Sequence, residues 1–323
     1  MIDIFNIADN NQKTQIFYSS SSGNTHFQTW QKPNGIKMIH FLVIGAGGGG
    51  GGGRTGGNNT GTGGGGGGSG GVSIGLFPAN LLPDILYISV GCGGLGGTPN
   101  TVGSTVGKGD NGGISFVCIS ASTGSTYVVM QSGDSVAGGG GRGDGSSNTG
   151  SAGVGSAIWD YTLDIWPQLG HITANAGQNG GIGGPTGNFG GSVTQSTIVT
   201  GGGGGGGESS VSTSYSGGSI NGTIYKFTRL TGGTADATGN TIVGSNGYFY
   251  NLPSQNASNK SSTLPMFFTG GAGGGAANSS SRNAGGGGAG AYGCGGGGGG
   301  ASYTGTGGTG GRGGDGLVII TCW

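Results

Sequence analysis

Few residues of this chain have the types and spacing that acid–base chemistry requires. The three histidines, His26, His40 and His171, have no carboxylate or nucleophile at a familiar spacing. Asp160 and Asp164 could serve glycan hydrolysis, which uses two carboxyl groups about 5–10 Å apart. Two solvated loop carboxylates are the simpler interpretation of that pair. We therefore expect no enzymatic activity and no cofactor.

The four cysteines lie far apart and form no C-x-x-C pair, and no histidine pair lies near them. Zinc ligands are usually closely spaced in sequence, and structural disulfides belong to oxidising compartments. We expect no metal site and interpret the cysteines as buried free thiols, with disulfides as the open alternative. The four residues are Cys92, Cys118, Cys294 and Cys322.

Aromatic residues outside the glycine-rich stretches are the best candidates for a binding site. Trp and Tyr rings stack on sugars, while nearby Asn, Asp and Ser side chains orient the ligand by hydrogen bonds. The alternative is structural: the rings cap a scaffold that has few side chains, or they are buried against a sister subunit. The candidate receptor-binding residues are Trp159, Tyr161, Trp166, Tyr248 and Tyr250.

Charge and hydrophobicity exclude several classes of partner. The chain has 11 basic and 11 acidic residues, so no basic excess is present to neutralise phosphates. The G-x-G-x-x-G matches follow from composition and lie in no strand–helix unit. The longest apolar run, residues 38–44, is far shorter than the roughly 20 residues of a spanning helix. We expect no nucleic-acid partner, no membrane insertion and, from the N-terminus, no secretory signal.

The scaffold that must position the aromatic residues is built mainly of glycine, with 92 glycines among 323 residues. Each glycine costs about 0.5–1 kcal/mol more to order than alanine does. Side-chain burial alone therefore cannot order this chain. Either the glycine runs are flexible linkers, or their backbones stabilise one another directly.

A three-residue period decides between these two alternatives. Residues 305–316 read GTGGTGGRGGDG, and the same spacing recurs in residues 91–98 and 180–185. This is the period of an extended polyproline-II-type helix, which rises about 3.1 Å per residue. Two of its three edges would be bare, so that the N–H and C=O groups of neighbouring backbones can pair. We predict a bundle of polyglycine-II-type rods.

Strand-like segments lie beside these runs. They are rich in Ile, Val, Phe or Tyr, and several continue directly into a glycine stretch. No helical periodicity exceeds ten residues. The predicted fold class is mainly β and irregular, with β-strands framing a bundle of polyglycine-II-type helices and almost no α-helix. The predicted strands cover residues 36–44, 72–77, 86–90, 114–119, 127–130 and 317–322.

Composition also divides the chain into two parts. Residues 1–35 are polar and aromatic, and we expect them to form an N-terminal anchoring segment. Residues 36–323 form the glycine-rich β/polyglycine-II domain. Two stretches escape the glycine bias, at about 150–178 and 208–269. We expect them to be loop excursions, which often carry function.

The order of these segments resembles a known family. Residues 29–53 (TWQKPNGIKMIHFLVIGAGGGGGGG), residues 81–100 and the ending GGRGGDGLVIITCW resemble the glycine-rich domain of phage structural and tail-fibre proteins. The resemblance covers most of residues 29–323, whereas residues 150–270 are particular to this chain. The layout is also similar to the polyglycine-II sandwich adhesins of T-even-type phages, whose loops at one end contact the host receptor. This chain differs from them in its N-terminal aromatic segment.

The resemblance implies a virion structural protein, a glycine-rich fibre or spike that displays loops for host-cell attachment without catalysis. Residues 1–35 would bind other virion proteins, and the receptor would be a host surface glycan or outer-membrane protein. Such a protein is made in the host cytoplasm and lies at the virion surface. We expect a homotrimer, because association would protect exposed sheet edges.

Two alternatives stay open at this point. One is a minor capsid or decoration protein that stabilises the virus shell. The other is an ice-binding protein, which needs a flat array of small residues. Thr306 and Thr309 begin such an array, but Arg312 and Asp315 interrupt it.

Overall fold

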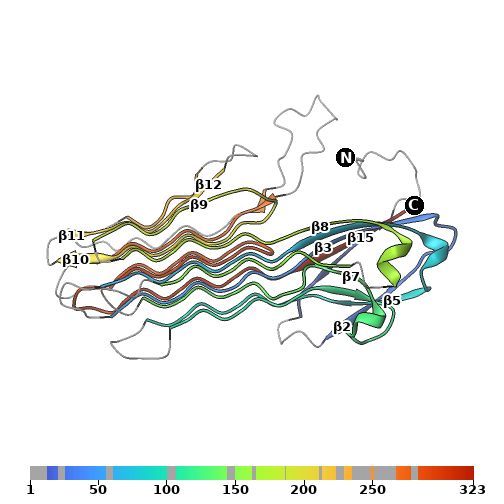
Figure 1. The fold of residues 1–323 in the computed structure, drawn as a ribbon, viewed down its shortest axis with the longest axis horizontal. Coiled ribbons are helices and arrows are strands. Elements are labelled where there is room, and N and C mark those ends of the chain that lie inside the picture. Colours follow the sequence, from blue (N-terminus) through green and yellow to red (C-terminus); the bar gives the residue numbers. More distant parts are fainter. Residues whose placement is uncertain are drawn as a thin grey trace, which may run out of the picture.

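The computed structural model describes most of the chain as an elongated molecule (Figure 1). Two β-sheets lie at one end, and a bundle of long, extended segments fills the rest of its length. The described residues are 13–20, 26–55, 61–99, 107–143, 150–161, 165–185, 187–210, 213–222, 229–234, 249–250, 267–277 and 283–323.

The two larger sheets are antiparallel. The five-stranded sheet has the order β1-β15-β3-β4-β8, and the four-stranded sheet has the order β2-β5-β6-β7. The strands of the first sheet are β1 (Lys13–Tyr18), β15 (Leu317–Cys322), β3 (Met38–Ile44), β4 (Val72–Pro78) and β8 (His171–Asn175). Those of the second are β2 (Phe27–Gln31), β5 (Ile85–Ser89), β6 (Phe116–Cys118) and β7 (Val128–Gln131).

One hydrophobic core lies between these sheets and makes them a sandwich. Alternate residues of β3 point into it, because successive side chains of a strand point to opposite faces. Phe41 is fully buried there and meets the ring of Phe77 edge-on, with 5.6 Å between the ring centroids. Leu86 of β5 and Met130 of β7 close the core from the opposite sheet.

The remaining elements are short. Three 3-10 turns are η1 (Ala79–Leu81), η2 (Ser125–Tyr127) and η3 (Trp166–Leu169). Short strand pairs are β9 (Val193–Thr194) with β12 (Ile220–Asn221), β10 (Glu208–Ser210) with β11 (Thr213–Ser214), and β13 (Phe249–Tyr250) with β14 (Phe267–Phe268). The described residues form no α-helix, and none of their helical turns has the length and apolar character to span a bilayer.

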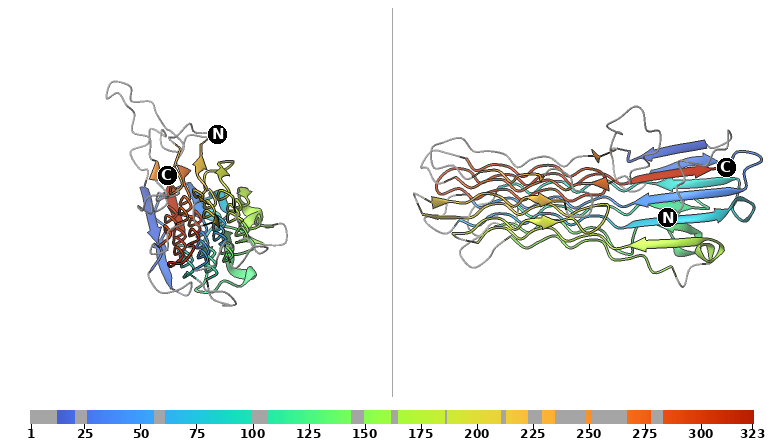
Figure 2. Two further views of the ribbon diagram at one scale, coloured as in Figure 1. Left: turned by 90° about the vertical axis from the view of Figure 1, so that its left-hand side faces the viewer. Right: turned by 90° about the horizontal axis from the view of Figure 1, so that it is seen from above.

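The glycine stretches form rods that pack side by side, as the end-on view in Figure 2 shows. Residues 45–53, which continue β3, lie at the centre of one such group. Their N–H groups donate in rotation to three antiparallel neighbours, 65–71, 107–113 and 308–314, at 2.7–3.0 Å. Their carbonyls accept in the same rotation from three further rods, at 94–97, 140–143 and 296–299.

Each rod therefore returns to the same neighbour every third residue. Residues 47, 50 and 53 all donate to the rod 308–314, which is the threefold repeat of a polyproline-II-type helix. A Cβ atom on Gly50 would overlap the carbonyl group of Gly297 in an adjoining rod. Glycine is needed there because the backbones are in direct contact. The predicted fold class is confirmed.

The structure also locates the segments that were set apart by composition. Strands β1 and β2, from the segment 1–35, are edge strands of the two sandwich sheets. The excursion expected at about 150–178 is narrower than predicted. Residues 150–156 hydrogen-bond as a rod, and β8 is part of the five-stranded sheet. Among the described residues of this stretch, 157–161 and 165–170 depart from both. Within 208–269, residues 215–218 and 232–233 also hydrogen-bond to rods.

Candidate functional site

Three of the five aromatic candidates come together at the sandwich rather than at the far end of the rods. Trp159 is 2% exposed and belongs to the sandwich core. The ring of Tyr161 lies 5.4 Å from it, centroid to centroid, and the Tyr161 hydroxyl donates to the Ile172 carbonyl at 3.2 Å. Trp159 therefore offers no face on which a sugar could stack in this structure.

Trp166 completes this aromatic group. It begins η3, is partly buried against the same core, and its Nε1 donates to the Thr126 carbonyl at 3.2 Å. Of the other candidates, Tyr248 lies outside the described residues. Tyr250 lies in β13 opposite Phe267, but its side chain is not part of the described structure. The structure thus brings three of the rings together, and a receptor-binding role for the five stays a prediction.

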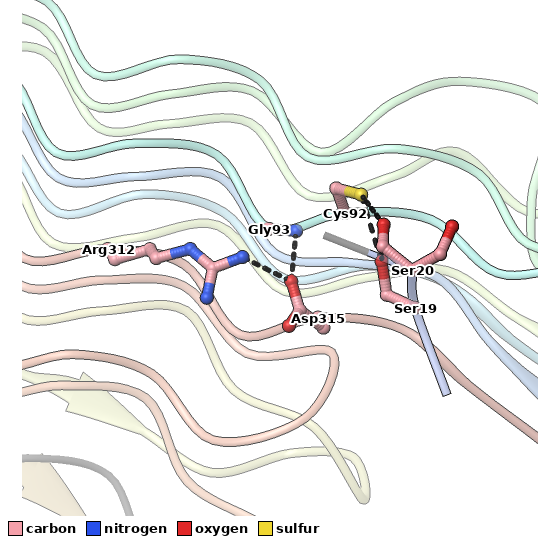
Figure 3. Close-up of polar contacts among 6 residues, drawn as sticks. All are labelled: Ser19, Ser20, Cys92, Gly93, Arg312 and Asp315. Atoms are coloured by element: carbon pink, nitrogen blue, oxygen red, sulfur yellow. Dashed lines mark hydrogen bonds and ion pairs between the residues drawn. The ribbon is translucent and has the colours of Figure 1, made fainter. Parts of the chain in front are cut away.

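A second group of polar residues lies where the N-terminal strand reaches the rods (Figure 3). The Cys92 thiol and the Ser19 hydroxyl are 2.9 Å apart. On the neighbouring rod, Arg312 pairs with Asp315 at 2.6 Å, and Asp315 accepts the Gly93 N–H at 2.8 Å.

The spacing of three that the sequence shows places one residue of each triplet on the outer edge of this rod. Thr306, Thr309 and Arg312 are exposed, and Asp315 is half-buried. The contacts in Figure 3 join the end of β1 to the rod that begins at residue 91, and that rod to the rod that carries Asp315.

The buried cysteines Cys118 and Cys294 are unsuited to nucleophilic chemistry. All four are free thiols, three of them buried and Cys92 half-buried. Burial raises the pKa of Cys118 and of Cys294 to about 12. A thiol with so high a pKa stays protonated at neutral pH, and the thiolate is the reactive form. The prediction of buried free thiols is confirmed for Cys118, Cys294 and Cys322.

The remaining polar candidates are the carboxylates and the histidines. Within the described ranges, no three His, Cys, Asp or Glu side chains lie close enough to hold a metal ion. Asp164 is outside those ranges, so its separation from Asp160 is not defined. His40 is half-buried on the outer face of β3, and its Nδ1 has no hydrogen-bond partner within the described structure.

The comparison with protein families is consistent with this architecture. A family model described as a glycine-rich domain matches residues 20–323. The chain belongs to the glycine-rich domain family. No curated protein matches the sequence. The family match begins after β1 and contains every rod of this glycine-rich domain.

One residue of this glycine-rich domain escaped the sequence analysis. Glu208 follows seven glycines and is the only glutamate in the chain. It lies in β10, at the end of the rods farthest from the sandwich (Figure 1). Its side chain is fully buried, and neither carboxylate oxygen has a hydrogen-bond partner in the described part of the chain.

Burial raises the pKa of Glu208 to about 7, although the nearby Gly61 amide and the Arg54 guanidinium each lower it. The carboxyl group is therefore close to half-protonated at neutral pH. A signal for this residue existed in the sequence. Glu208 keeps the three-residue phase of Gly202 and Gly205, which face the rod 294–301, so its side chain was bound to point at a neighbouring rod.

Proposed function

We propose that this glycine-rich domain is a non-enzymatic virion structural protein, a fibre or spike that displays loops for attachment to a host cell. The observation that carries the proposal is the arrangement of the rods. Hydrogen-bonded rods extend from a β-sandwich, and the chain reverses direction between successive antiparallel rods at the end opposite the sandwich. Such a bundle is a stiff spacer that holds its connecting segments at a distance from its base.

Those reversals are well distributed along the sequence. Each joins a rod that leaves the sandwich to one that returns, and the described rod ends that it joins lie on the side away from the sandwich. Loops presented by a rigid scaffold commonly carry binding function. The antiparallel rod pairs are 45–54 with 62–71, 91–97 with 107–113, 138–141 with 151–154, 181–184 with 188–191, 202–207 with 215–218, 272–275 with 285–288, and 297–300 with 308–311.

We further propose that the sandwich end faces the particle and that residues 1–35 contribute to its attachment there. Strands β1 and β2 have a partner on only one side in the described structure, as do β7 and β8. Open sheet edges favour pairing with another chain. Association as a homotrimer would cover some of these sheet edges. Light scattering from the purified chain measures its oligomeric state directly.

Immunogold electron microscopy tests the location of the protein. Antibody raised against the purified chain is expected to label projecting fibres or spikes on virus particles from the source culture. Labelling spread over the shell between capsomers would favour the decoration-protein alternative. Particles without label would contradict both proposals.

A binding competition tests the attachment role. Purified full-length chain, added to host cells before the virus, is expected to reduce virus adsorption in a dose-dependent way. Heat-denatured chain is the control. Unchanged adsorption at saturating concentrations of the folded chain would contradict receptor binding.

A further inference from the structure

Asparagine followed by glycine is a pair prone to spontaneous deamidation, because glycine has no Cβ atom that hinders approach of its backbone nitrogen to the asparagine side chain. The chain contains five such pairs, beginning at Asn34, Asn111, Asn179, Asn221 and Asn246. Asn246 lies outside the described residues, and Asn221 is half-buried in β12. The other three asparagines are all exposed, so exposure does not distinguish them.

The pair at Asn111 is held by a neighbouring rod at both of the groups that would react. Asn111 Oδ1 accepts the Gly139 N–H at 3.0 Å, and the Gly112 N–H donates to the Ala137 carbonyl at 2.9 Å. Gly112 is also tightly packed, because a Cβ atom there would overlap the Gly47 carbonyl oxygen. The side-chain carbonyl and the backbone nitrogen are therefore fixed apart from each other.

The pair at Asn179 repeats this arrangement. Asn179 Oδ1 accepts the Gly155 N–H at 2.8 Å, and the Gly180 N–H donates to the Gly153 carbonyl at 2.9 Å. A Cβ atom on Gly180 would overlap the Gly66 carbonyl. Reaction at this pair would require at least two hydrogen bonds of the rod bundle to open first.

The pair at Asn34 lies in a different setting, the turn that joins β2 of one sheet to β3 of the other. The turn is anchored on both sides. The Lys32 N–H donates to the Asp84 carbonyl at 2.7 Å, and the Lys37 N–H donates to the Trp323 carbonyl at 2.7 Å. Residues 33–36 project between these two anchors.

Neither reacting group of this turn is held. Within the described residues, Asn34 and Gly35 make no hydrogen bond that would restrain the side-chain amide or the backbone nitrogen. Gly35 has a φ of +82°, which favours glycine, and open space surrounds the position that a Cβ atom would take. The side chain and the backbone of the turn can therefore rotate toward each other without displacing any packed group.

We propose that Asn34 is a modification site, at which the folded protein deamidates spontaneously. The Gly35 nitrogen attacks Cγ of Asn34 and forms a new C–N bond. The Cγ–Nδ2 bond breaks, and Nδ2 leaves as ammonia with the proton of the Gly35 N–H. Water then opens the resulting succinimide ring at one of its two carbonyls, which yields aspartate or isoaspartate without any change of oxidation state.

Both products alter the sandwich end of the molecule. Each carries a carboxylate at neutral pH, so the formal net charge of the chain falls from zero to −1. Isoaspartate also adds a methylene group to the backbone that links the two sheets. The reaction needs only the folded chain and water, and this inference does not rest on the proposed virion role.

Peptide mass spectrometry of the full chain, incubated at neutral pH and physiological temperature, tests the proposal. Enzymatic methylation of isoaspartate confirms the product. We expect Asn34 to deamidate at least about tenfold faster than Asn111 or Asn179, because the rod pairs must first break hydrogen bonds. The two rod pairs are matched internal controls, since they have the same dipeptide sequence and are also exposed. Asn34→Gln should remove the signal, because glutamine forms the corresponding ring far more slowly.

The same chain unfolded in denaturant separates structure from sequence. There the three pairs should react at similar rates, because the hydrogen bonds that protect Asn111 and Asn179 are gone. Equal rates at Asn34 and Asn179 in the folded chain would overturn the proposal. So would a folded chain in which Asn34 stays unmodified for a time in which all three pairs react in denaturant.

Discussion

The β-sandwich and the rod bundle are continuous in the chain, since β3 runs directly into residues 45–53 and residues 307–316 run into β15. Their cohesion is nevertheless different. The sandwich buries large side chains such as Phe41 and Leu86 between two sheets. The bundle brings bare backbones into contact, and each central rod hydrogen-bonds to six neighbours.

This difference determines which changes each region tolerates. In the sandwich, a missing side chain leaves a cavity whose walls relax in part. In the bundle, an added methyl group cannot be accommodated, because backbone atoms of another rod already occupy the position of its carbon. The sandwich should therefore be sensitive to the loss of atoms, and the rod bundle to their addition.

The largest effect is expected from Gly50→Ala. The new Cβ would overlap the Gly297 carbonyl and force apart rods joined by buried hydrogen bonds. Each buried group left without a partner costs about 1–3 kcal/mol, so we expect a loss of about 5 kcal/mol or more, or a chain that does not fold.

Chemical denaturation measures this loss, with Gly124→Ala as the control. A Cβ on Gly124 would make only an ordinary contact, 3.6 Å from the Tyr127 ring. That variant should be neutral or slightly more stable, because alanine has fewer unfolded conformations than glycine. Similar stabilities for the two variants would refute direct backbone packing.

Phe41→Ala tests the other half of the comparison. Removal of this fully buried ring, which packs on Phe77, should lower the free energy of unfolding by about 3–5 kcal/mol. Ile85→Ala, at a position 46% exposed on β5, should cost less than about 1 kcal/mol.

Hydrogen exchange of the Phe41→Ala variant should show the sandwich amides losing more protection than the distal rod amides. Uniform loss in both regions would show that they unfold as one unit.

Glu208→Gln should alter the pH dependence of stability at the far end of the rods. The pKa of Glu208 is about 7 in the folded protein, against an ordinary value of 4.5. Between these values the folded state keeps a proton that the unfolded state has lost, so stability falls as pH rises from about 4.5 to 7.

Glutamine mimics the protonated form of the carboxyl group, so the variant should not lose this stability as the pH rises. At pH 8 the variant should be more stable than the parent chain by about 1–3 kcal/mol, and at pH 4 the two should be nearly equal. Melting curves across this pH range measure the difference. Parallel curves for the two proteins would show that Glu208 is not buried in its neutral form.

The smallest effects are expected on the outer edge of the bundle. Arg312→Ala removes a half-exposed partner of Asp315 and should cost less than about 0.5 kcal/mol. Asp315→Ala also leaves the Gly93 N–H without its acceptor and should cost about 1 kcal/mol. A larger loss for Arg312→Ala than for Asp315→Ala would contradict this order, because Asp315→Ala removes the same ion pair and the contact with Gly93 as well.

The sequence predicted the rods more accurately than the surroundings of the aromatic residues. The spacing of Thr306, Thr309 and Arg312 predicted that one edge of a rod carries the side chains, and in the structure these residues are exposed. For the aromatic residues, composition allowed both a binding surface and a structural cap. Trp159 lies in the core, which local sequence could not reveal because the strands that cover it come from distant parts of the chain.

The sequence by itself determined the local conformation of this protein. A period of three with two bare edges permits little besides extended, left-handed rods, and alternating apolar residues specify the strands. Only the tertiary structure decided which rods are neighbours, because one glycine run presents the same surface as another. It also decided where departures from glycine matter, since Glu208 is buried against rods that are distant in sequence.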